Sequence, residues 1–460
     1  MDFPVIAQAT PADQIATPGL GKALAARHVA MISIGGIIGA GLFVGSSAAI
    51  HQVGPAITVS YGLAGLVILM VMRMLGEMAV AAPEVGSFTE YARLGLGRWA
   101  GFTSGWLYWY FWVVVVAIEA IAGAKLIQEW IPGPVWLIGI VLLAAMTATN
   151  LFSARAYGEF EFWFASLKVG AIVAFIIIAG SYVFGLTPGH QGGMSLLSSH
   201  GGFAPFGPVS VLAGVTSVIF ALCGAEIATI AAAESAEPTK IIAKMTGTVV
   251  IRIVLFYVLS IGLILAIVPW DSIVPGQSPF ALALEAIGFP AAATVMKIIV
   301  LTAVLSCLNS GLYVTSRVLF TLAAKGDAPK FMVTLSKRQV PARAILIGSV
   351  FGYLALIASV LSPEKVFAFL VNASGALMLI VYLMIAAAQI VVRRRLEREA
   401  PELLTLKMWF FPYASYGVIA VIGAVLVAMA FTPDLATQLY ASLICTGVVL
   451  GAYRLVRARA

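Results

Sequence analysis

Long apolar segments follow one another along nearly the whole chain, separated by short polar connections. A helix that crosses a bilayer needs about 20 mostly apolar residues. The pattern therefore predicts twelve spanning helices, near residues 30–50, 55–82, 100–130, 135–153, 161–185, 209–232, 246–268, 291–323, 343–361, 366–391, 409–431 and 436–453. These runs are too long and too uniformly apolar for the short alternating strands of a membrane β-barrel. The predicted fold class is an all-α, polytopic membrane protein.

Two of these segments, the first and the sixth, are interrupted by small residues near mid-depth. The first contains GGIIGAGLFVGS, residues 35–46, and the sixth contains FALCGAE, residues 220–226. Such a break frees backbone N–H and C=O groups that hydrocarbon cannot satisfy, so the broken backbone must line a cavity or a ligand. Small residues also serve close helix packing, and this is our interpretation of Gly97, Gly101 and Gly105. Paired breaks at matching positions instead indicate the binding site of a transporter.

Composition and charge agree with a membrane protein and exclude a nucleic-acid partner. Of the 460 residues, 61% are hydrophobic and 10% are charged, and the mean hydropathy is +1.03. The net charge of +7 arises from Lys and Arg in segments predicted to be cytoplasmic, whereas the outer segments hold only Lys365. By the positive-inside rule, both termini are predicted to lie in the cytoplasm, with the chain in the inner (plasma) membrane. The basic run RRRLERE, residues 393–399, is read as a cytoplasmic anchor, with lipid binding as the alternative.

The order of the segments predicts two halves of five spans, and an odd number per half makes the second half inverted relative to the first. The first 28 residues lack the pattern of a removable signal peptide. A polar stretch after the second span, residues 83–97, predicts a cytoplasmic interfacial helix, and residues 234–244 form a similar segment. The predicted divisions are a cytoplasmic N-terminal tail, the first half, an extracellular loop, the second half, and the last two spans with a cytoplasmic C-terminus, at residues 1–28, 29–185, 186–208, 209–393 and 394–460.

Ionisable residues inside the predicted spans are costly in a bilayer, so each is a functional candidate. Glu119 lies midway along the third span, Lys168 in the fifth, and Glu226 directly after the sixth-span break. Arg73 and Glu77 are four residues apart near the inner end of the second span, the spacing of a helical ion pair. We therefore expect Arg73 and Glu77 to be structural and the other three to be candidates for function.

Other function classes find less support in the sequence. A channel would show a continuous pore-lining pattern or a repeated filter loop, and neither is present. An enzyme would need a nucleophile and base or metal ligands, but the histidines fall near span ends or in loops. The cysteines inside spans predict no disulfide and no metal site; they are Cys223, Cys307 and Cys445. No GxxxxGK phosphate loop appears. A secondary transporter without cofactors is therefore favoured, and the oligomeric state stays open.

Several motifs resemble one known family. GGIIGAGLFVGS, RMLGEMAVAAPEVGSFTEYA, YGEFEFWFASLKV and LTAVLSCLNSGLYVTSRVLF are similar to motifs of the amino acid permeases of the amino acid, polyamine and organocation (APC) superfamily. The resemblance runs from about residue 21 to residue 457. Within the superfamily, GWLYWYFWVVVVAIEAIAGA and YGEFEFW are most similar to bacterial 4-aminobutyrate (GABA) permeases.

The resemblance implies a five-plus-five inverted-repeat fold of the LeuT type, with discontinuous helices 1 and 6, and proton-coupled import of an amino acid by alternating access. It also implies that Lys168 occupies the place where sodium-coupled relatives hold sodium. A desolvated lysine can release a proton during transport, or it can be a permanently charged strut, and both interpretations stay open. Glu226 is the second candidate for proton coupling. An α-amino acid permease of the same fold is the alternative to a GABA permease.

The breaks suggest how a zwitterionic substrate would be held. A half-helix beginning near Gly39–Gly41 would direct free N–H groups at a carboxylate, and open carbonyls around Phe220–Cys223 would accept from an ammonium. Because GABA's charges are far apart, Glu119 is expected to be a more distant acceptor, and Phe220 a gate. The expected substrate-binding residues are Ile38, Gly39, Ala40, Gly41, Phe220, Ala221, Leu222, Cys223, Glu119, Asn309 and Ser374.

Overall fold

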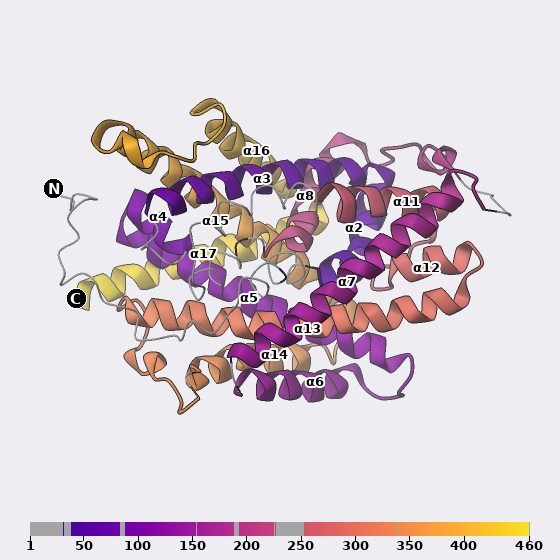
Figure 1. The fold of residues 1–460 in the computed structure, drawn as a ribbon, viewed down its shortest axis with the longest axis horizontal. Helices are drawn as coiled ribbons and strands as arrows, with labels where there is room; N and C mark the ends of the chain where they lie inside the picture. The colour runs from indigo at the N-terminus through magenta and orange to yellow at the C-terminus, as the bar shows by residue number, and fades with distance from the viewer. Residues whose placement is uncertain are drawn as a thin grey trace.

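The structure, a computed structural model, describes residues 31, 38–82, 88–152, 154–187, 193–224, 226, 253–338 and 340–459. Within these ranges every regular element is a helix. Figure 1 shows the long helices running side by side along the longest axis of the molecule. The predicted segment at residues 234–244 lies outside the described residues. The all-α class predicted from the apolar pattern is confirmed.

The helices fall at the apolar segments of the sequence, because each helix satisfies its own backbone polar groups where no water is available. The short amphipathic helix after the second apolar segment is α4 (Phe88–Leu96). The other α-helices are α2 (Ser46–Val53), α3 (Ile57–Ala81), α5 (Arg98–Gln128), α6 (Val135–Asn150), α7 (Ala154–Val183), α8 (Gly207–Leu222), α11 (Ser260–Ile267), α12 (Pro279–Ala286), α13 (Pro290–Ala324), α14 (Ala342–Ala358), α15 (Pro363–Glu399), α16 (Tyr413–Ala430) and α17 (Pro433–Arg459). Two π-helical segments are η1 (Gly41–Gly45) and η5 (Ile253–Leu259).

Seven helices in the described parts of the chain are long and apolar enough to cross a membrane. They are Gly41–Ala81, Arg98–Gln128, Gly158–Val183, Pro290–Ala324, Lys365–Glu399, Tyr413–Ala430 and Leu435–Arg457. Four further apolar helices are shorter: Val135–Asn150, Gly207–Leu222, Ile253–Ile267 and Ala342–Ala358. At about 1.5 Å per residue, these span less than the roughly 30 Å of a hydrocarbon core. The count of twelve spans stays a prediction.

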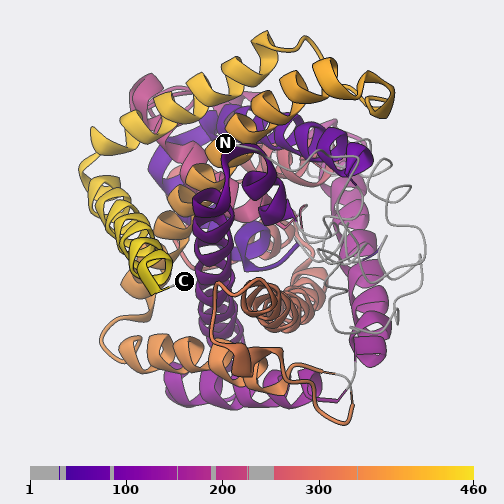
Figure 2. The ribbon, with the colours of Figure 1, turned by 90° about the vertical axis from the view of Figure 1, so that its left-hand side faces the viewer.

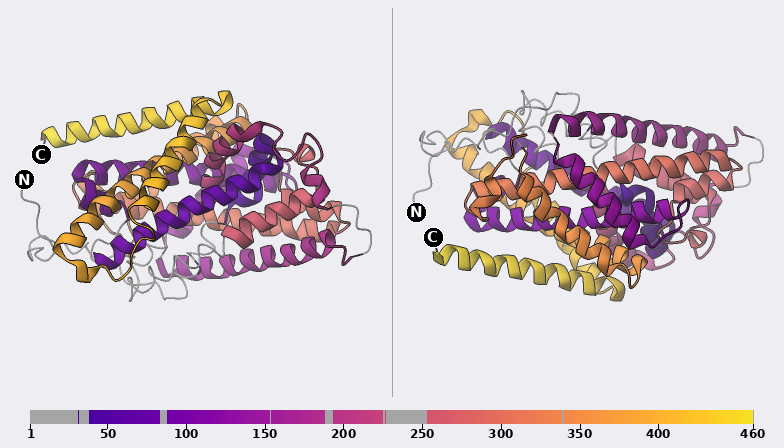
Figure 3. Two further views of the ribbon diagram at one scale, coloured as in Figure 1. Left: turned by 90° about the horizontal axis from the view of Figure 1, so that it is seen from above. Right: turned by 90° about the horizontal axis from the view of Figure 1, so that it is seen from below.

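The core of the bundle is built around α5, and α17 lies on its outside. In the apolar part of α5, 83% of the residues are buried, against 11% in that of α17. The helices α6 and α14 pack together along one edge, below α13 in Figure 1. In Figures 2 and 3, α17, drawn in yellow, runs along the periphery. A site on α5 is therefore enclosed by the bundle, whereas one on α17 faces the surroundings.

The glycines around the start of α5 have two different roles. A Cβ on Gly101 would lie 2.6 Å from Arg93 Cβ, and one on Gly105 would lie 2.6 Å from Leu322 Cδ2, so packing is confirmed for both. The packing interpretation of Gly97 is wrong. Gly97 has a φ of +94° between α4 and α5, where its Cβ position meets only Trp99 at 3.9 Å. It makes a turn that other residues rarely adopt.

A buried carboxylate, Glu77, ties α3 to α15 and to the connection before α16. Its oxygens accept from Gln389 Nε2 at 2.7 Å, from Arg393 Nη1 at 2.5 Å and from the Met408 N–H at 2.5 Å. The expected Arg73–Glu77 ion pair is therefore wrong. Arg73 Nε instead donates to a backbone carbonyl, that of Lys407, at 2.9 Å. Gln389, Arg393 and the Met408 N–H offer Glu77 three hydrogen bonds, more than Arg73 alone would provide.

A second polar cluster joins α4, α5 and the end of α13. Asp327 forms ion pairs with Arg93 of α4 and, at 3.4 Å, with Arg98 of α5. Its backbone carbonyl accepts from Trp106 Nε1 at 3.1 Å. The carboxylate of Asp327 is fully buried. This cluster fixes the short helix α4 against the core at the same end of the bundle as Glu77.

Candidate functional site

The first break is a real departure from α-helical geometry. Ile38 and Gly39 are not helical, and the chain then forms the π-helix η1 at Gly41–Gly45 before continuing into α2. π-Helical turns leave backbone groups out of the α-helical ladder and are frequent at functional sites. The residues just before this break, 32–37, lie outside the described residues. The half-helix expected to begin near Gly39–Gly41 is formed by η1 and α2, and its role in holding the substrate carboxylate stays a prediction.

The second break ends α8 at Leu222. Cys223 is extended, with a ψ of 151°, and Gly224 has a φ of +114°. The small residues noted in the sequence thus allow the chain to leave the helix, since the conformation of Gly224 is rare for other residues. The last carbonyls of a helix lack partners within it. Polar backbone groups are consequently exposed to the site at the end of α8. Residues 227–252 lie outside the described residues, so the continuation of this segment is not seen.

The two breaks lie directly against each other, although 180 positions separate them in the sequence. A Cβ on Gly41 would lie 2.7 Å from Ala221 Cα and 3.2 Å from the ring of Phe220. A larger residue than glycine at position 41 would force η1 and α8 apart. The ring of Phe220 also approaches Phe111 of α5, with 6.5 Å between the ring centroids. Gly41, Ala221 and Phe220 of the predicted site are therefore brought together.

Glu119 of α5 contacts the first break directly. Both of its carboxylate oxygens lie 3.0 Å from the N–H of Ala40, and the side chain is buried. A Cβ on Gly39 would meet Glu119 Oε1 at 2.5 Å and Cys307 Cβ at 2.7 Å. Gly39 thus lets α5 and α13 approach the broken backbone. Glu119 is not the separate, distant acceptor that the sequence suggested, because it lies on an N–H group expected to hold the substrate carboxylate.

Lys168 of α7 lies in a buried charged cluster with a carboxylate that the sequence analysis missed. Lys168 Nζ is 3.6 Å from Glu161 Oε1, and both side chains are fully buried. Glu161 Oε2 accepts from Ser306 Oγ of α13 at 2.6 Å. The spacing of seven residues, two helical turns, puts Glu161 and Lys168 on one face of α7. The predicted fifth span begins at residue 161. A charge at the end of a span needs no partner, so Glu161 was not recognised as a buried charge.

Three further groups surround the end of α8. Tyr257 Oη of η5 donates to the Ala221 carbonyl at 2.9 Å, so one of the expected open carbonyls already has a partner. Glu226 accepts from the Gly224 N–H at 3.0 Å and from Tyr382 Oη of α15 at 3.3 Å. Cys223 Sγ is 3.6 Å from the same Tyr382 hydroxyl. Both tyrosines were missed, because nothing local in their sequence distinguishes them from other aromatic residues in spans.

Two predicted site residues have other partners. The amide oxygen of Asn309 accepts from Asn150 Nδ2 at 2.6 Å and from Thr149 Oγ1 at 3.1 Å, which ties α13 to α6. Cys307, which contacts Gly39, points from a different side of α13 because two residues turn a helix by about 200°. Ser374 is buried and donates within α15 to the Val371 carbonyl at 2.8 Å. The geometry therefore links neither residue to the breaks.

Two polar aromatic groups on α5 add donors near the site. The hydroxyl of Tyr108 and the indole N–H of Trp112 are buried and make no hydrogen bond of good geometry in the described part of the chain, and the hydroxyl lies near both Trp112 and Glu226. With Glu119 at i+11 and i+7, they follow one face of the helix. Buried polar groups without partners are rare, and each calls for a ligand or water.

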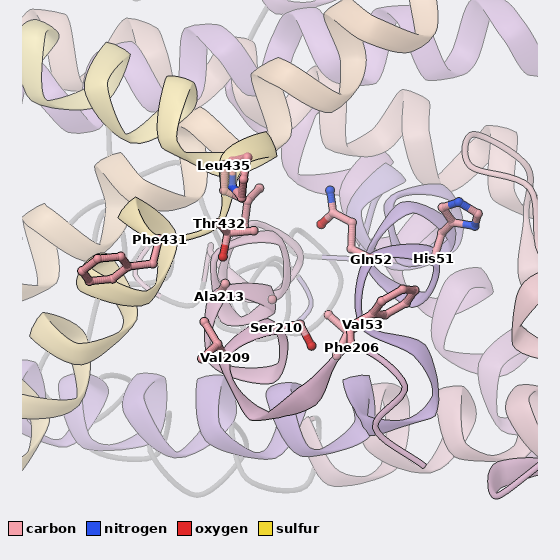
Figure 4. A pocket seen from close by; sticks show the side chains of 12 residues that line it. His51, Gln52, Val53, Phe206, Val209, Ser210, Ala213, Phe431, Thr432 and Leu435 are labelled. Carbon is pink, nitrogen blue, oxygen red and sulfur yellow. The ribbon is translucent and has the colours of Figure 1, made fainter. Parts of the chain in front are cut away.

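Two cavities among the described residues lie near the site region. One of about 30 Å³, room for about one water molecule, lies between Val44, Ala122 and Phe367. A larger one, of about 430 Å³, lies between α2, α8 and the connection from α16 to α17 (Figure 4). His51, Gln52 and Ser210 are its polar lining on α2 and α8. Ala40, Glu119 and Lys168 line neither of these two cavities.

The family described as "Amino acid permease" matches residues 28–459, nearly the whole chain. The chain belongs to this family. A gamma-aminobutyric acid permease of Bacillus subtilis (strain 168) is 50% identical over 443 residues, covering 96% of this chain and 94% of that protein. A gamma-aminobutyric acid permease of Escherichia coli (strain K12) is 44% identical and covers 95% of both chains. The resemblance read from the motifs is confirmed, and this permease is a multi-pass membrane protein.

Solved structures of other transporters share the fold of this chain. A nucleobase-cation-symport-1 family transporter, in a closed conformation with bromovinylhydantoin bound, superposes with a TM-score of 0.54 at 16% identity. The match covers 96% of this permease and 97% of that chain. At this identity the likeness shows the fold alone. Among the described residues, no group of three or more His, Cys, Asp or Glu could hold a metal ion.

Proposed function

We propose that this permease is a proton-coupled secondary transporter that imports 4-aminobutyrate by alternating access. The single observation that carries the proposal is the contact between the two broken helices, with a buried carboxylate on the Ala40 N–H of the first break. The 50% identity to a gamma-aminobutyric acid permease supports the substrate. The proposal includes twelve spans in a five-plus-five inverted repeat, with both termini cytoplasmic in the inner membrane.

Glu119 and the substrate carboxylate compete for the same backbone donor. Both oxygens of Glu119 lie 3.0 Å from the Ala40 N–H, and two carboxylates at one N–H repel each other strongly in a medium of low dielectric constant. The substrate carboxylate therefore takes the Ala40 N–H only when Glu119 moves away or is protonated. The displaced carboxylate then pairs with the substrate ammonium. A zwitterion with separated charges satisfies both groups at once.

The remaining polar groups complete the binding of the substrate. The carbonyls of Phe220 and Leu222 at the end of α8 accept from the ammonium, while Tyr257 holds the Ala221 carbonyl in place at 2.9 Å. Tyr108 and Trp112 supply buried donors on the α5 side. The Phe220 ring, which lies against Gly41, covers the substrate. These contacts recognise an amine and a carboxylate, and the distance between them selects among amino acids.

Coupling to protons is assigned to the buried charges next to the site. Lys168, Glu161 and Ser306 form one cluster between α7 and α13, and Cys307 of α13 contacts Gly39 at the first break. A change of charge in this cluster is therefore transmitted to the first break through a single residue of α13. Glu226, held by Gly224 and Tyr382, is the second candidate carrier.

Uptake of labelled GABA into proteoliposomes, with and without an inward proton gradient, tests the proposal. The expected result is accumulation that requires the gradient and is blocked by unlabelled GABA but not by proline, lysine or phenylalanine. Entry of another amino acid in place of GABA would overturn the substrate and favour an α-amino acid permease. If no amino acid of the panel enters under either condition, transport itself is contradicted.

The variant Lys168→Ala tests the coupling role. Removal of the ammonium is expected to abolish gradient-driven accumulation while exchange of internal for external GABA continues, because the substrate groups on α5 and α8 remain. Lys297→Ala is the matched control, since Lys297 lies at 3.1 Å from Glu129 in a partly exposed ion pair on α13. Full accumulation by Lys168→Ala would leave Lys168 as a structural strut only.

A further inference from the structure

A groove of about 560 Å³ lies between the first turn of α5 and the last turns of α17. Its lining consists of Trp99, Gly447, Leu450, Gly451, Tyr453, Arg454 and Arg457. None of these residues belongs to the substrate site. The volume is within the range of sites that hold one ligand of moderate size. The groove is therefore large enough for part of a lipid molecule.

The apolar part of the groove follows one face of α17. Gly447, Leu450, Gly451 and Arg454 have the spacing i, i+3, i+4 and i+7 of a single helical face. A Cβ added to Gly447 or to Gly451 would meet nothing within 4 Å. The two glycines thus leave open space that no side chain of the described bundle fills. Since only 11% of the apolar part of α17 is buried, this face is open to the bilayer.

The polar end of the groove carries two exposed cations. Arg454 and Arg457 are exposed, and neither has an ion-pair partner among the residues that the structure describes. The sequence contains no Asp or Glu after residue 434. The neighbouring Arg98 differs, because it is paired with Asp327 at 3.4 Å. Positive charge is therefore concentrated at the end of α17, with no ion-pair partner among the described residues.

Aromatic residues mark the boundary between the apolar and polar parts. Trp99 is 41% exposed at the edge of the groove. Tyr453 packs against Phe102, with 5.5 Å between ring centroids, and this contact fixes α17 against α5. Trp and Tyr prefer the level of the lipid headgroups. The order along α17, two glycines, then Tyr453, then two arginines, matches the order of a phospholipid from acyl chain to phosphate.

We infer that this groove binds one anionic phospholipid of the cytoplasmic leaflet. The phosphate lies between Arg454 and Arg457, which match its charge and its hydrogen-bond acceptors. One acyl chain follows the face formed by Gly447 and Gly451. An anionic lipid is favoured over a zwitterionic one, because a choline or ethanolamine group would return a positive charge to a site that already holds two. The inference rests on the proposed cytoplasmic position of the C-terminus, and it is independent of the substrate.

Native mass spectrometry of the purified full chain, incubated with phosphatidylglycerol or phosphatidylcholine in detergent, tests the site. The wild type is expected to retain one phosphatidylglycerol more than Arg454→Gln/Arg457→Gln. The matched control is Lys330→Gln/Lys337→Gln, which removes two exposed cations from the connection after α13 and is expected to bind like the wild type. Arg454→Lys/Arg457→Lys is expected to restore part of the binding, since its charge is kept but its planar geometry is lost.

A second variant tests the groove without a change of charge. Gly451→Leu places a side chain in the open space and is expected to remove the same lipid although both arginines remain. Because α17 is peripheral, this variant is expected to keep the fold, as checked by its elution volume and unfolding temperature. Equal phosphatidylglycerol retention by the wild type and the double glutamine variant would overturn the inference. Retention of phosphatidylcholine by the wild type to the same extent as phosphatidylglycerol would also overturn it. So would full retention of phosphatidylglycerol by Gly451→Leu.

Discussion

At the residue scale, the proposed function depends most on the side chain of Glu119. Its carboxylate takes the place of an anionic ligand on the Ala40 N–H, at 3.0 Å from both oxygens. A buried backbone donor is thereby satisfied in the absence of substrate, at the cost of holding a carboxylate in the bundle. Gly39 makes the approach possible, since a Cβ there would lie 2.5 Å from Glu119 Oε1. Under the proposed function, substrate affinity depends on an exchange of partners at this N–H.

The variant Glu119→Gln tests the exchange. GABA affinity is expected to fall by about 10- to 150-fold, as the loss of a charged hydrogen bond of about 1.5 to 3 kcal/mol predicts. Butyrate, which has no ammonium, is expected to bind better than to the wild type, because no displaced carboxylate repels it. Equilibrium binding of both compounds measures the two affinities. Glu129→Gln is the control, because Glu129 follows the end of α5 and its side chain is 44% exposed. An unchanged preference for GABA over butyrate would contradict the exchange.

At the scale of elements, α7 carries a buried ion pair, and the carboxylate of that pair accepts a hydrogen bond from Ser306 of α13 at 2.6 Å. The Lys168–Glu161 pair is fully buried, with 3.6 Å between Nζ and Oε1. Replacing a buried pair as a whole is often neutral for stability, whereas removing one partner costs about 3 to 5 kcal/mol. A pair of this kind is therefore weak support for a purely structural role. Its proximity to Cys307 and the first break favours a functional one.

A double-mutant cycle separates stability from coupling in this pair. Glu161→Gln alone is expected to lower the free energy of unfolding by about 3 to 5 kcal/mol, because Lys168 loses its counter-charge. Lys168→Met/Glu161→Gln is expected to recover most of that loss and still fail to accumulate GABA with a proton gradient. Unfolding in detergent and uptake in proteoliposomes supply the two readings. A double variant that accumulates GABA normally would reduce the pair to packing.

At the scale of the whole molecule, polar clusters at one end hold distant parts of the chain together. Glu77 joins α3 to α15 and to the Met408 backbone, and Asp327 joins α13 to α4 and α5. Apolar contacts inside a bilayer discriminate little between neighbouring helices, since lipid tails are as apolar as leucine. Hydrogen bonds of fixed geometry therefore select which helices meet. Helices that lie far apart in the sequence are assembled by these few carboxylates.

Substitutions of Glu77 and Glu397, which both pair with Arg393, test this role of Glu77. Glu77→Ala removes three hydrogen bonds and leaves Arg393 buried, so a loss of about 3 to 5 kcal/mol in unfolding free energy is expected. The side chain of Glu397 is 43% exposed. Glu397→Ala removes the other ion-pair partner of Arg393. Its expected cost is about 1 kcal/mol or less, because water screens and replaces an exposed pair. Chemical unfolding in detergent measures both. Equal losses would contradict the assembly role of Glu77.

Most of the fold class was readable from the sequence because its causes are local. Apolar runs of sufficient length form helices in a bilayer whatever they pack against. The break at Gly224 was also readable, since only a residue without a Cβ adopts its φ of +114° readily,. Glu119, Lys168 and Glu226 stood out because a charge inside an apolar run is conspicuous. Motif resemblance supplied the family, which the family match confirmed.

Partnerships between segments were decided only by the tertiary structure. The rotation of a helix about its axis changes by about 100° per residue, so small errors in span boundaries prevent any statement of which residues face each other. Asn309 therefore was expected in the site but contacts α6, and Glu161, Tyr257 and Tyr382 were missed. The sequence by itself determined the helices, the breaks and the buried charges. Which charge meets which backbone group, such as Glu119 on Ala40, followed from packing between distant segments, because no local pattern records it.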